Sequence, residues 1–137
     1  MTEPSVSAAP AVVLPRRIDP AEAFFWFMDH VSSMNFMVIA EGVGELDDAA
    51  VRAALARAQQ EHVLLRAAIT TNAEHRLIWT PAPDVPLDYQ VVAVESDWRT
   101  PLAEALVRPF PLGSAPLVRA MRLNQADGRW TLALIFH

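Results

Sequence analysis

The side chains of this sequence that could do acid–base or metal chemistry are four histidines and scattered carboxylates. His30, His62 and His75 are widely spaced and form neither an H-x-x-x-H nor an H-E-x-x-H pattern. Metal sites need several ligands at defined spacings, so we predict no metal site from these residues. His75 falls between two apolar runs, and we expect it to be solvated at the tip of a hairpin. His137 differs from the other three because it ends a strongly apolar run.

Two further segments resemble a Ser-His-Asp triad and a phosphate-binding loop, but physical arguments disfavour both interpretations. Ser32 and Ser33 follow Asp29 and His30 directly. Adjacent side chains on a helix do not face one another, and no nucleophile elbow surrounds the serines, so we interpret them as a helix end and a turn. Residues 42–44 read G-V-G but are followed by acidic residues, which disfavours a phosphate-binding loop.

Composition excludes several classes of function. The chain has 137 residues, 53% of them apolar, a net charge of −5 and neither cysteine nor lysine. Nucleic-acid binding needs a basic stripe, so nucleic acid is not an expected partner. No signal peptide and no run of about 18 uncharged apolar residues is present, so we expect no membrane span and a soluble, cytoplasmic protein. We predict a flexible amino-terminal tail over 1–14 and one folded unit over 15–137.

Three helices are expected from their starting signals. Asp19-Pro20-Ala21-Glu22 provides an N-cap, a proline in the first turn and an acidic first turn, which predicts a helix over 20–30. Leu46-Asp47-Asp48 caps a second helix that runs to about residue 62, and Ser96-Asp97 caps a third. We expect His62 to be a partly buried residue at the helix end.

Six strands are expected between and after these helices. Residues 34–42 are almost continuously apolar and predict a buried strand, and Asp127-Gly128 predicts the turn of a terminal hairpin. The segments concerned are 34–42, 65–71, 76–80, 88–94, 116–124 and 129–136. Arg119 and Arg122 alternate with apolar residues, and we expect them to be solvated or interfacial. Helices and hairpins interleave, so the fold class is mixed α/β.

Several segments resemble signatures of one acyltransferase superfamily. Residues 62–66 are similar to the H-x-x-L-R signature that follows the first long helix of condensation-type acyltransferases. Residues 108–120, RPFPLGSAPLVRA, resemble their PFDL…PL-x-R signature, and residues 24–46 fit their opening helix, strand and G-x-L-D turn. Residues 132–137, LALIFH, resemble the strand that runs into the H-H-x-x-x-D-G motif. The chain thus resembles the amino-terminal lobe of the chloramphenicol acetyltransferase-like superfamily, which includes nonribosomal peptide condensation domains, polyketide-associated acyltransferases and wax ester synthases.

The resemblance implies both an architecture and a reaction. The architecture is a mixed sheet with flanking helices, one half of a two-lobed pseudo-dimer whose active site lies between the lobes. The reaction moves an acyl group from the thioester of CoA or of a phosphopantetheinyl acyl carrier protein to a hydroxyl or an amine. A histidine general base removes the acceptor's proton, an effect worth roughly 10²–10⁴-fold. The thioester is a substrate, so no cofactor and no metal is expected; the partners are the second lobe, the thioester donor and the acceptor.

The sequence departs from the family pattern at two positions. Pro111 replaces the usual Asp, and His137 aligns with the first His of the motif, so that the second His, the Asp and the Gly would lie beyond it. A register shifted by one residue would make His137 the base itself, and a third interpretation is that this histidine is incidental. We take His137 as the candidate catalytic residue and expect the isolated chain, truncated at its catalytic motif, to be inactive. The alternative function is a non-catalytic lobe that docks a carrier protein or a partner chain.

Overall fold

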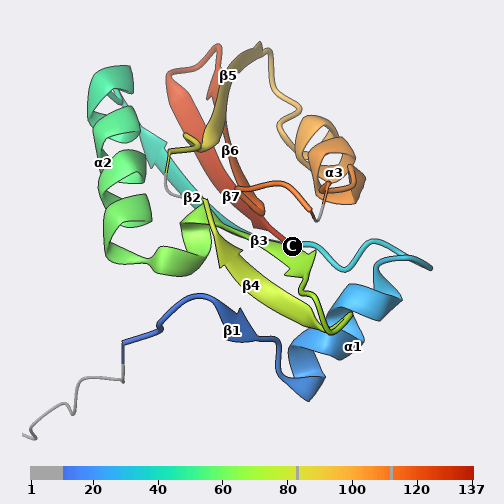
Figure 1. Cartoon of the computed structure of the whole chain (residues 1–137). Coiled ribbons are helices and arrows are strands. Elements are labelled where there is room, and N and C mark those ends of the chain that lie inside the picture. The colour runs from blue at the N-terminus through green and yellow to red at the C-terminus, as the bar shows by residue number, and fades with distance from the viewer. Residues whose placement is uncertain (1–10, 83, 112) are drawn as a thin grey trace, which may run out of the picture.

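The computed structural model describes residues 11–82, 84–111 and 113–137, which form two β-sheets and three α-helices (Figure 1). The larger sheet has the order β2-β7-β6-β5, with bounds Phe36–Val43, Arg129–Phe136, Val118–Gln125 and Asp88–Val94. The smaller sheet has the order β1-β4-β3, with bounds Arg16–Arg17, Leu77–Pro81 and Ala67–Thr71. The helices are α1 (Pro20–Met28), α2 (Asp48–Glu61) and α3 (Arg99–Val107), and a 3₁₀ turn, η1 (Val63–Arg66), follows α2.

The pairing of the strands confirms the mixed α/β class. β5 and β6 are parallel and are joined through α3, whereas all the other pairs in the two sheets are antiparallel. β6 and β7 form the predicted hairpin, with Gly128 at a φ of 81°, a conformation that glycine adopts without strain. Most of the predicted tail lies outside the described residues. Within the described ranges, no helix has the length and apolarity needed to cross a membrane.

The two central strands of the larger sheet, β6 and β7, are largely buried because a helix covers each face of the sheet. Val51 of α2 packs near Ala120 on one face. Leu102 of α3 packs with Leu123 and Ala133 on the other. Successive side chains of a strand point to opposite faces, so β6 and β7 supply apolar residues to both layers. The two central strands therefore run through the middle of the core.

The smaller sheet and α1 pack together beyond α3, at the end of β7 where the chain terminus lies (Figure 1). Ile69 of β3 is buried with Phe110 and Ile135 in one cluster, against which Trp26 of α1 and Trp79 of β4 pack. Ile135 is fully buried, and His137 follows it on the same face by strand alternation. This packing places the end of β7 between α1, α3 and the smaller sheet.

The predicted helix starts are confirmed by their hydrogen bonds. Asp19 accepts from the Glu22 N–H at 2.8 Å, and the Glu22 carboxylate accepts from the Asp19 N–H at 2.7 Å, which forms a capping box. Asp47 is the N-cap of α2 and accepts from the Ala49 and Ala50 N–H groups, the second and third of that helix. The N-cap of α3 is Trp98, and Asp97, one residue before it, accepts from the Arg99 and Thr100 N–H groups. Each cap stabilises its helix by about 1 kcal/mol. α1 ends at Met28, two residues before the predicted boundary.

The prediction that the first long strand is buried was wrong. β2 pairs only with β7 in the larger sheet, so it is an edge strand, and most of its residues are exposed. An apolar run indicates burial only if something covers the strand, and within the described structure nothing covers the outer edge of β2.

The predictions for three polar side chains were also wrong. Arg119 and Arg122 are only 5% and 7% exposed, because β6 is an inner strand with a helix on each face. Their guanidinium groups donate to backbone carbonyls, Arg122 to Leu46 O at 2.7 Å and Arg119 to the loop after α3. His62 is exposed rather than partly buried, because it caps α2 where η1 turns the chain.

Candidate functional site

His137 lies directly after β7, and its surroundings make its imidazole a buried group. Its backbone N–H donates to Leu117 O at 3.1 Å, which continues the strand pairing by one residue. Its side chain is 5% exposed. Burial lowers the pKa of His137 below its ordinary value, and the nearby Asp29 carboxylate opposes this shift only in part. The imidazole is therefore neutral near pH 7, the form that can accept a proton.

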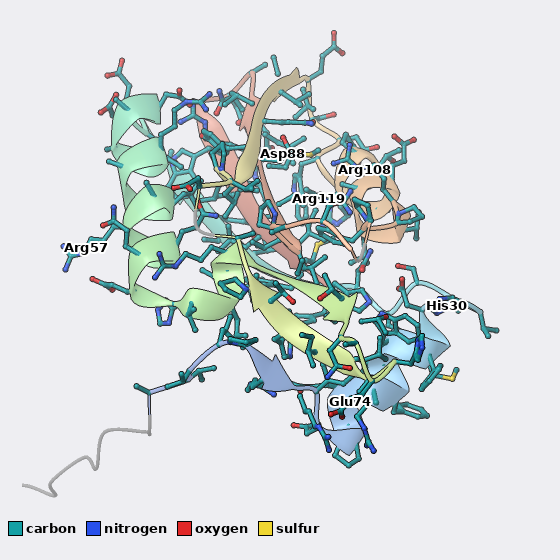
Figure 2. The ribbon with its side chains drawn as sticks, in the orientation of Figure 1. His30, Arg57, Glu74, Asp88, Arg108 and Arg119 are labelled. Atoms are coloured by element: carbon teal, nitrogen blue, oxygen red, sulfur yellow. The ribbon has the colours of Figure 1, made fainter. Side chains whose placement is uncertain are left out.

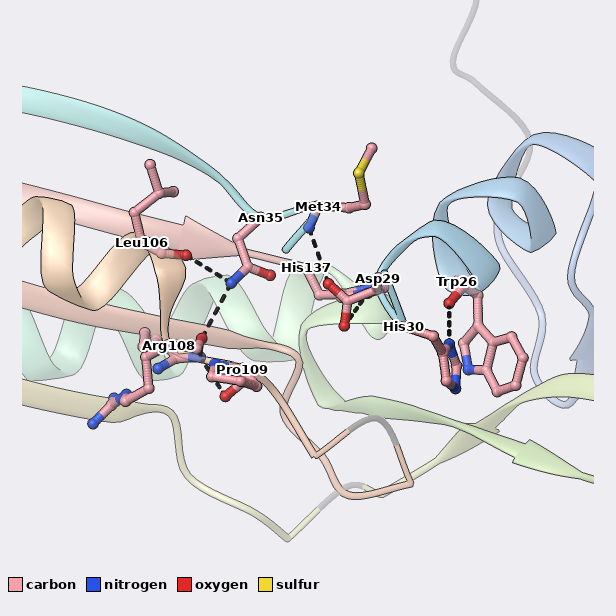
Figure 3. A network of polar contacts seen from close by, with 10 residues as sticks. Trp26, Asp29, His30, Met34, Asn35, Leu106, Arg108, Pro109 and His137 are labelled. Atoms are coloured by element: carbon pink, nitrogen blue, oxygen red, sulfur yellow. Dashed lines mark hydrogen bonds and ion pairs between the residues drawn. The ribbon is translucent and has the colours of Figure 1, made fainter. Parts of the chain in front are cut away.

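Asp29 faces His137 from the end of α1 (Figure 3). The Asp29 Oδ2 atom lies 3.6 Å from His137 Nε2, and the Asp29 side chain is 11% exposed. The Asp29 Oδ1 atom accepts the Met34 N–H at 2.9 Å, and the Asp29 N–H donates to Phe25 O at 3.0 Å. The carboxylate is therefore held between the end of α1 and the loop that leads into β2.

Two side chains join the loops around His137 (Figure 3). Asn35 Nδ2 donates to Leu106 O at 2.8 Å and to Arg108 O at 3.2 Å, which ties the start of β2 to the end of α3. Arg119 Nη2 donates to Arg108 O at 2.8 Å and to Pro109 O at 3.1 Å. Figure 2 shows Arg119 beside Arg108 and Asp88, near α3. Burial, and secondarily the charge of Arg108, lower the pKa of Arg119.

A cavity of about 160 Å³ borders His137. Its walls come from α1, the start of β2 and the smaller sheet, and are formed by Glu22, Phe25, Met34, Phe36, Ile69, Trp79 and His137. The walls are mainly apolar, and the size is close to that of an engineered cavity of about 150 Å³ that holds a benzene ring. The site can therefore hold a small apolar group next to an imidazole.

Glu22 is the acidic member of this wall, and its charge is compensated. Burial opposes its ionisation, but hydrogen bonds from Arg16 and from the Asp19 backbone outweigh that effect and lower the pKa of Glu22. Arg16 Nη1 donates to Glu22 Oε2 at 2.9 Å. Glu22 is therefore a structural carboxylate that holds β1 on α1.

The other histidines do not join this site. His30 follows α1 and is exposed, with its ring against Trp26 and its Nδ1 2.9 Å from Trp26 O. His75 is exposed at the β3–β4 turn, as predicted, with a φ of 58°. No group of three or more potential metal ligands forms among the residues the structure describes.

Of the polar residues around the site, the sequence indicated His137 alone. The sequence pattern associates Asp29 only with its neighbours His30 and the serines, and it gives no signal for Asn35. Asp29 and Asn35 contact residues that are far from them in the sequence, so no spacing within one segment could have indicated these contacts.

The order of the strands and helices defines the class of fold. The chain has the chloramphenicol acetyltransferase-like fold of condensation domains, with one lobe's share of their length. The family resemblance of the sequence signatures is thereby confirmed at the level of the fold.

Three solved structures illustrate this likeness. The X-domain from teicoplanin biosynthesis has a TM-score of 0.79 at 20% identity, over 94% of this chain and 29% of that one. The first condensation domain of the CDA synthetase has a TM-score of 0.74 at 17% identity, over 90% and 34%. A variant of the starter condensation domain of rhizomide synthetase, in complex with C8-CoA, has a TM-score of 0.72 at 17% identity, over 90% and 30%.

Sequence comparison agrees with the structural likeness. The chondramide synthase of Chondromyces crocatus is 31% identical to this chain over 140 residues, which cover 93% of this chain and 4% of that protein. No family model matches the chain. The chain spans about a third or less of each of these proteins.

Proposed function

We propose that this chain is one lobe of a transferase that moves an acyl group from the thioester of CoA or of a carrier protein to a hydroxyl or an amine. The active site lies at the end of β7, beside His137. The observation that carries this proposal is a buried, neutral imidazole next to a small apolar cavity. It is supported by the condensation-domain fold and by a similar domain in complex with C8-CoA.

The proposed reaction requires one base and no covalent intermediate with the protein. The acceptor's oxygen or nitrogen attacks the thioester carbonyl carbon while an imidazole takes the acceptor's proton. The C–S bond then breaks, and the thiol leaves with that proton. We propose that His137 is this base; in the other register the base is the second histidine of the motif, next to His137 in the chain.

A second lobe is the proposed partner, because apolar surface is exposed beside the site. Phe27 and Val31, at and after the end of α1, are 61% and 81% exposed. Phe36 and Val38 of the edge strand β2 are 56% and 57% exposed. Exposed apolar patches of this kind mark interfaces, and permanent interfaces are large and apolar. We propose that the second lobe covers this surface and completes the site.

The experiment uses the native protein purified from the cells that produce it, together with any partner bound to it. The chain is recovered under native conditions, and its native mass is compared with the 15.1 kDa of the 137 residues. The recovered material is then incubated with acyl-CoA thioesters of several lengths and with amine and alcohol acceptors. Released CoA is measured with a thiol reagent, to which this cysteine-free chain contributes no background. The proposal predicts a mass above 15.1 kDa, release of CoA that depends on an acceptor, and an ester or amide product.

The second candidate function is a lobe that docks a carrier protein or partner chain without chemistry. The observation in its favour is the exposed apolar surface formed by Phe27, Val31, Phe36 and Val38, which a partner could cover without any reaction. One of the similar structures is a complex of the teicoplanin X-domain with OxyB, a case of a similar domain that binds a protein. Stable association with a partner, combined with no acceptor-dependent CoA release, would replace the transferase proposal with this one.

A further inference from the structure

We propose that Asp29 is the positioning residue of His137: its carboxylate accepts the Nε2–H of the imidazole and leaves Nδ1 as the basic nitrogen of the site. The role of His137 in this inference rests on the proposed function. The pairing itself is defined by the geometry and can be tested without turnover.

The Asp29 carboxylate is oriented before it meets the imidazole. Its Oδ1 is occupied by the Met34 N–H at 2.9 Å, which leaves Oδ2 directed toward His137 Nε2 at 3.6 Å (Figure 3). That distance is longer than a hydrogen bond. Hydrogen bonds of catalytic groups are often long in the absence of substrate and tighten when it binds.

The two ring nitrogens of His137 have different surroundings. Nε2 is fully buried and has no hydrogen-bond partner within the described chain, so its N–H needs an acceptor. Asp29 Oδ2 is an acceptor that faces it. Nδ1 makes no hydrogen bond to a residue the structure describes and is not among the fully buried unpaired atoms. The nitrogen free to accept a proton is therefore Nδ1.

The other charged groups around the ring are already paired. Glu22, on the cavity wall, is bound by Arg16. The Arg119 guanidinium donates to the carbonyls after α3, and the His30 ring lies against Trp26. Asp29 is thus the carboxylate placed to stabilise an imidazolium at His137. A carboxylate in this position orients the imidazole and stabilises the charge that forms when the base takes a proton.

The test is a ¹⁵N and ¹H NMR titration of the 137-residue chain, compared with Asp29→Asn and Asp29→Glu. The His137 signals are identified by their loss in His137→Gln. In the wild type we expect the Nε2–H tautomer. Asn keeps one oxygen for the Met34 N–H but has no charge, and its NH₂ group then faces Nε2. We therefore expect Asp29→Asn to lower the titration midpoint of His137 and to move its proton to Nδ1, and Asp29→Glu to restore part of the midpoint.

His62 and His75, which lie far from Asp29 in the sequence, provide the control, because their NMR signals should be the same in the wild type and in every variant. The thermal midpoint of Asp29→Asn shows whether the fold is intact. An Nδ1–H tautomer in the wild type, or an unchanged His137 midpoint in a folded Asp29→Asn variant, would overturn the inference. A failed transfer assay with the expected titration would instead count against the proposed function alone.

Discussion

The buried side chain of Gln59 connects α2 to two other segments, and its removal should have a large cost. Gln59 Nε2 donates to Leu65 O at 3.0 Å and to Val85 O at 3.1 Å, and Gln59 Oε1 accepts the Leu87 N–H at 3.1 Å. Each such bond contributes about 1 kcal/mol net, and buried backbone groups left unpaired cost at least as much. We expect Gln59→Leu to lower the free energy of unfolding by about 3 kcal/mol.

Urea unfolding, followed by tryptophan fluorescence, measures this difference, and thermal unfolding should show a shift of roughly 10 °C. The matched control is Gln60→Leu, because Gln60 is the exposed neighbour on the same helix and should change stability by less than about 0.5 kcal/mol. If Gln59→Leu lowers the free energy of unfolding by less than about 1 kcal/mol, or if the control lowers it equally, these three hydrogen bonds do not stabilise the packing of the β4–β5 loop on α2.

Three further predictions concern the sheet, the histidine and the cavity. A Cβ at Gly42 would overlap the Trp130 ring on the neighbouring strand, so Gly42→Ala should cost about 1–3 kcal/mol in urea unfolding, whereas Gly113→Ala, with open space around it, should be neutral. The pKa of His137 is lowered in the folded chain, so the unfolded chain binds more protons just below the ordinary histidine pKa of about 6.5. Stability should therefore fall as the pH drops from about 6.5, and by less in His137→Gln; equal pH dependence would contradict the assigned burial. If the acyl group occupies the cavity of about 160 Å³, donors with up to about six acyl carbons should react fastest, and Ile69→Ala should shift the optimum to longer chains.

Local signals predicted the helices and the terminal hairpin well. Asp19 and Asp47 cap their helices, and Asp97 binds the first N–H groups of α3; all three depend only on residues a few positions away. The Asp127-Gly128 turn is equally local. The class of fold followed from the order of these elements, and the family signatures agreed with it.

The environment of each strand could not be read from its own residues. β2 is as apolar as a buried strand, yet it is exposed because it lies at the sheet edge. Arg119 and Arg122 look like surface residues, yet they are buried because carbonyls on distant segments accept their hydrogen bonds. Burial depends on which strands are neighbours, and that is a property of the tertiary arrangement.

The candidate site was predictable in part for the same reason. His137 was indicated by its place after an apolar strand and by its likeness to a family motif. Asp29 reaches it only because α1 packs beside the end of β7, and the cavity exists only between α1 and the smaller sheet. Neither arrangement has a signature within one stretch of sequence.

The measurement that tests the central claim most directly is acceptor-dependent CoA release by the native material, compared between the wild type, His137→Ala and His75→Ala. We expect His137→Ala to lower the transfer rate at least about 100-fold, the lower end of what a positioned base supplies. His75→Ala should retain the full rate, because His75 is exposed at a hairpin turn. Transfer at the wild-type rate in a folded His137→Ala variant would contradict the assignment of the active site to the end of β7.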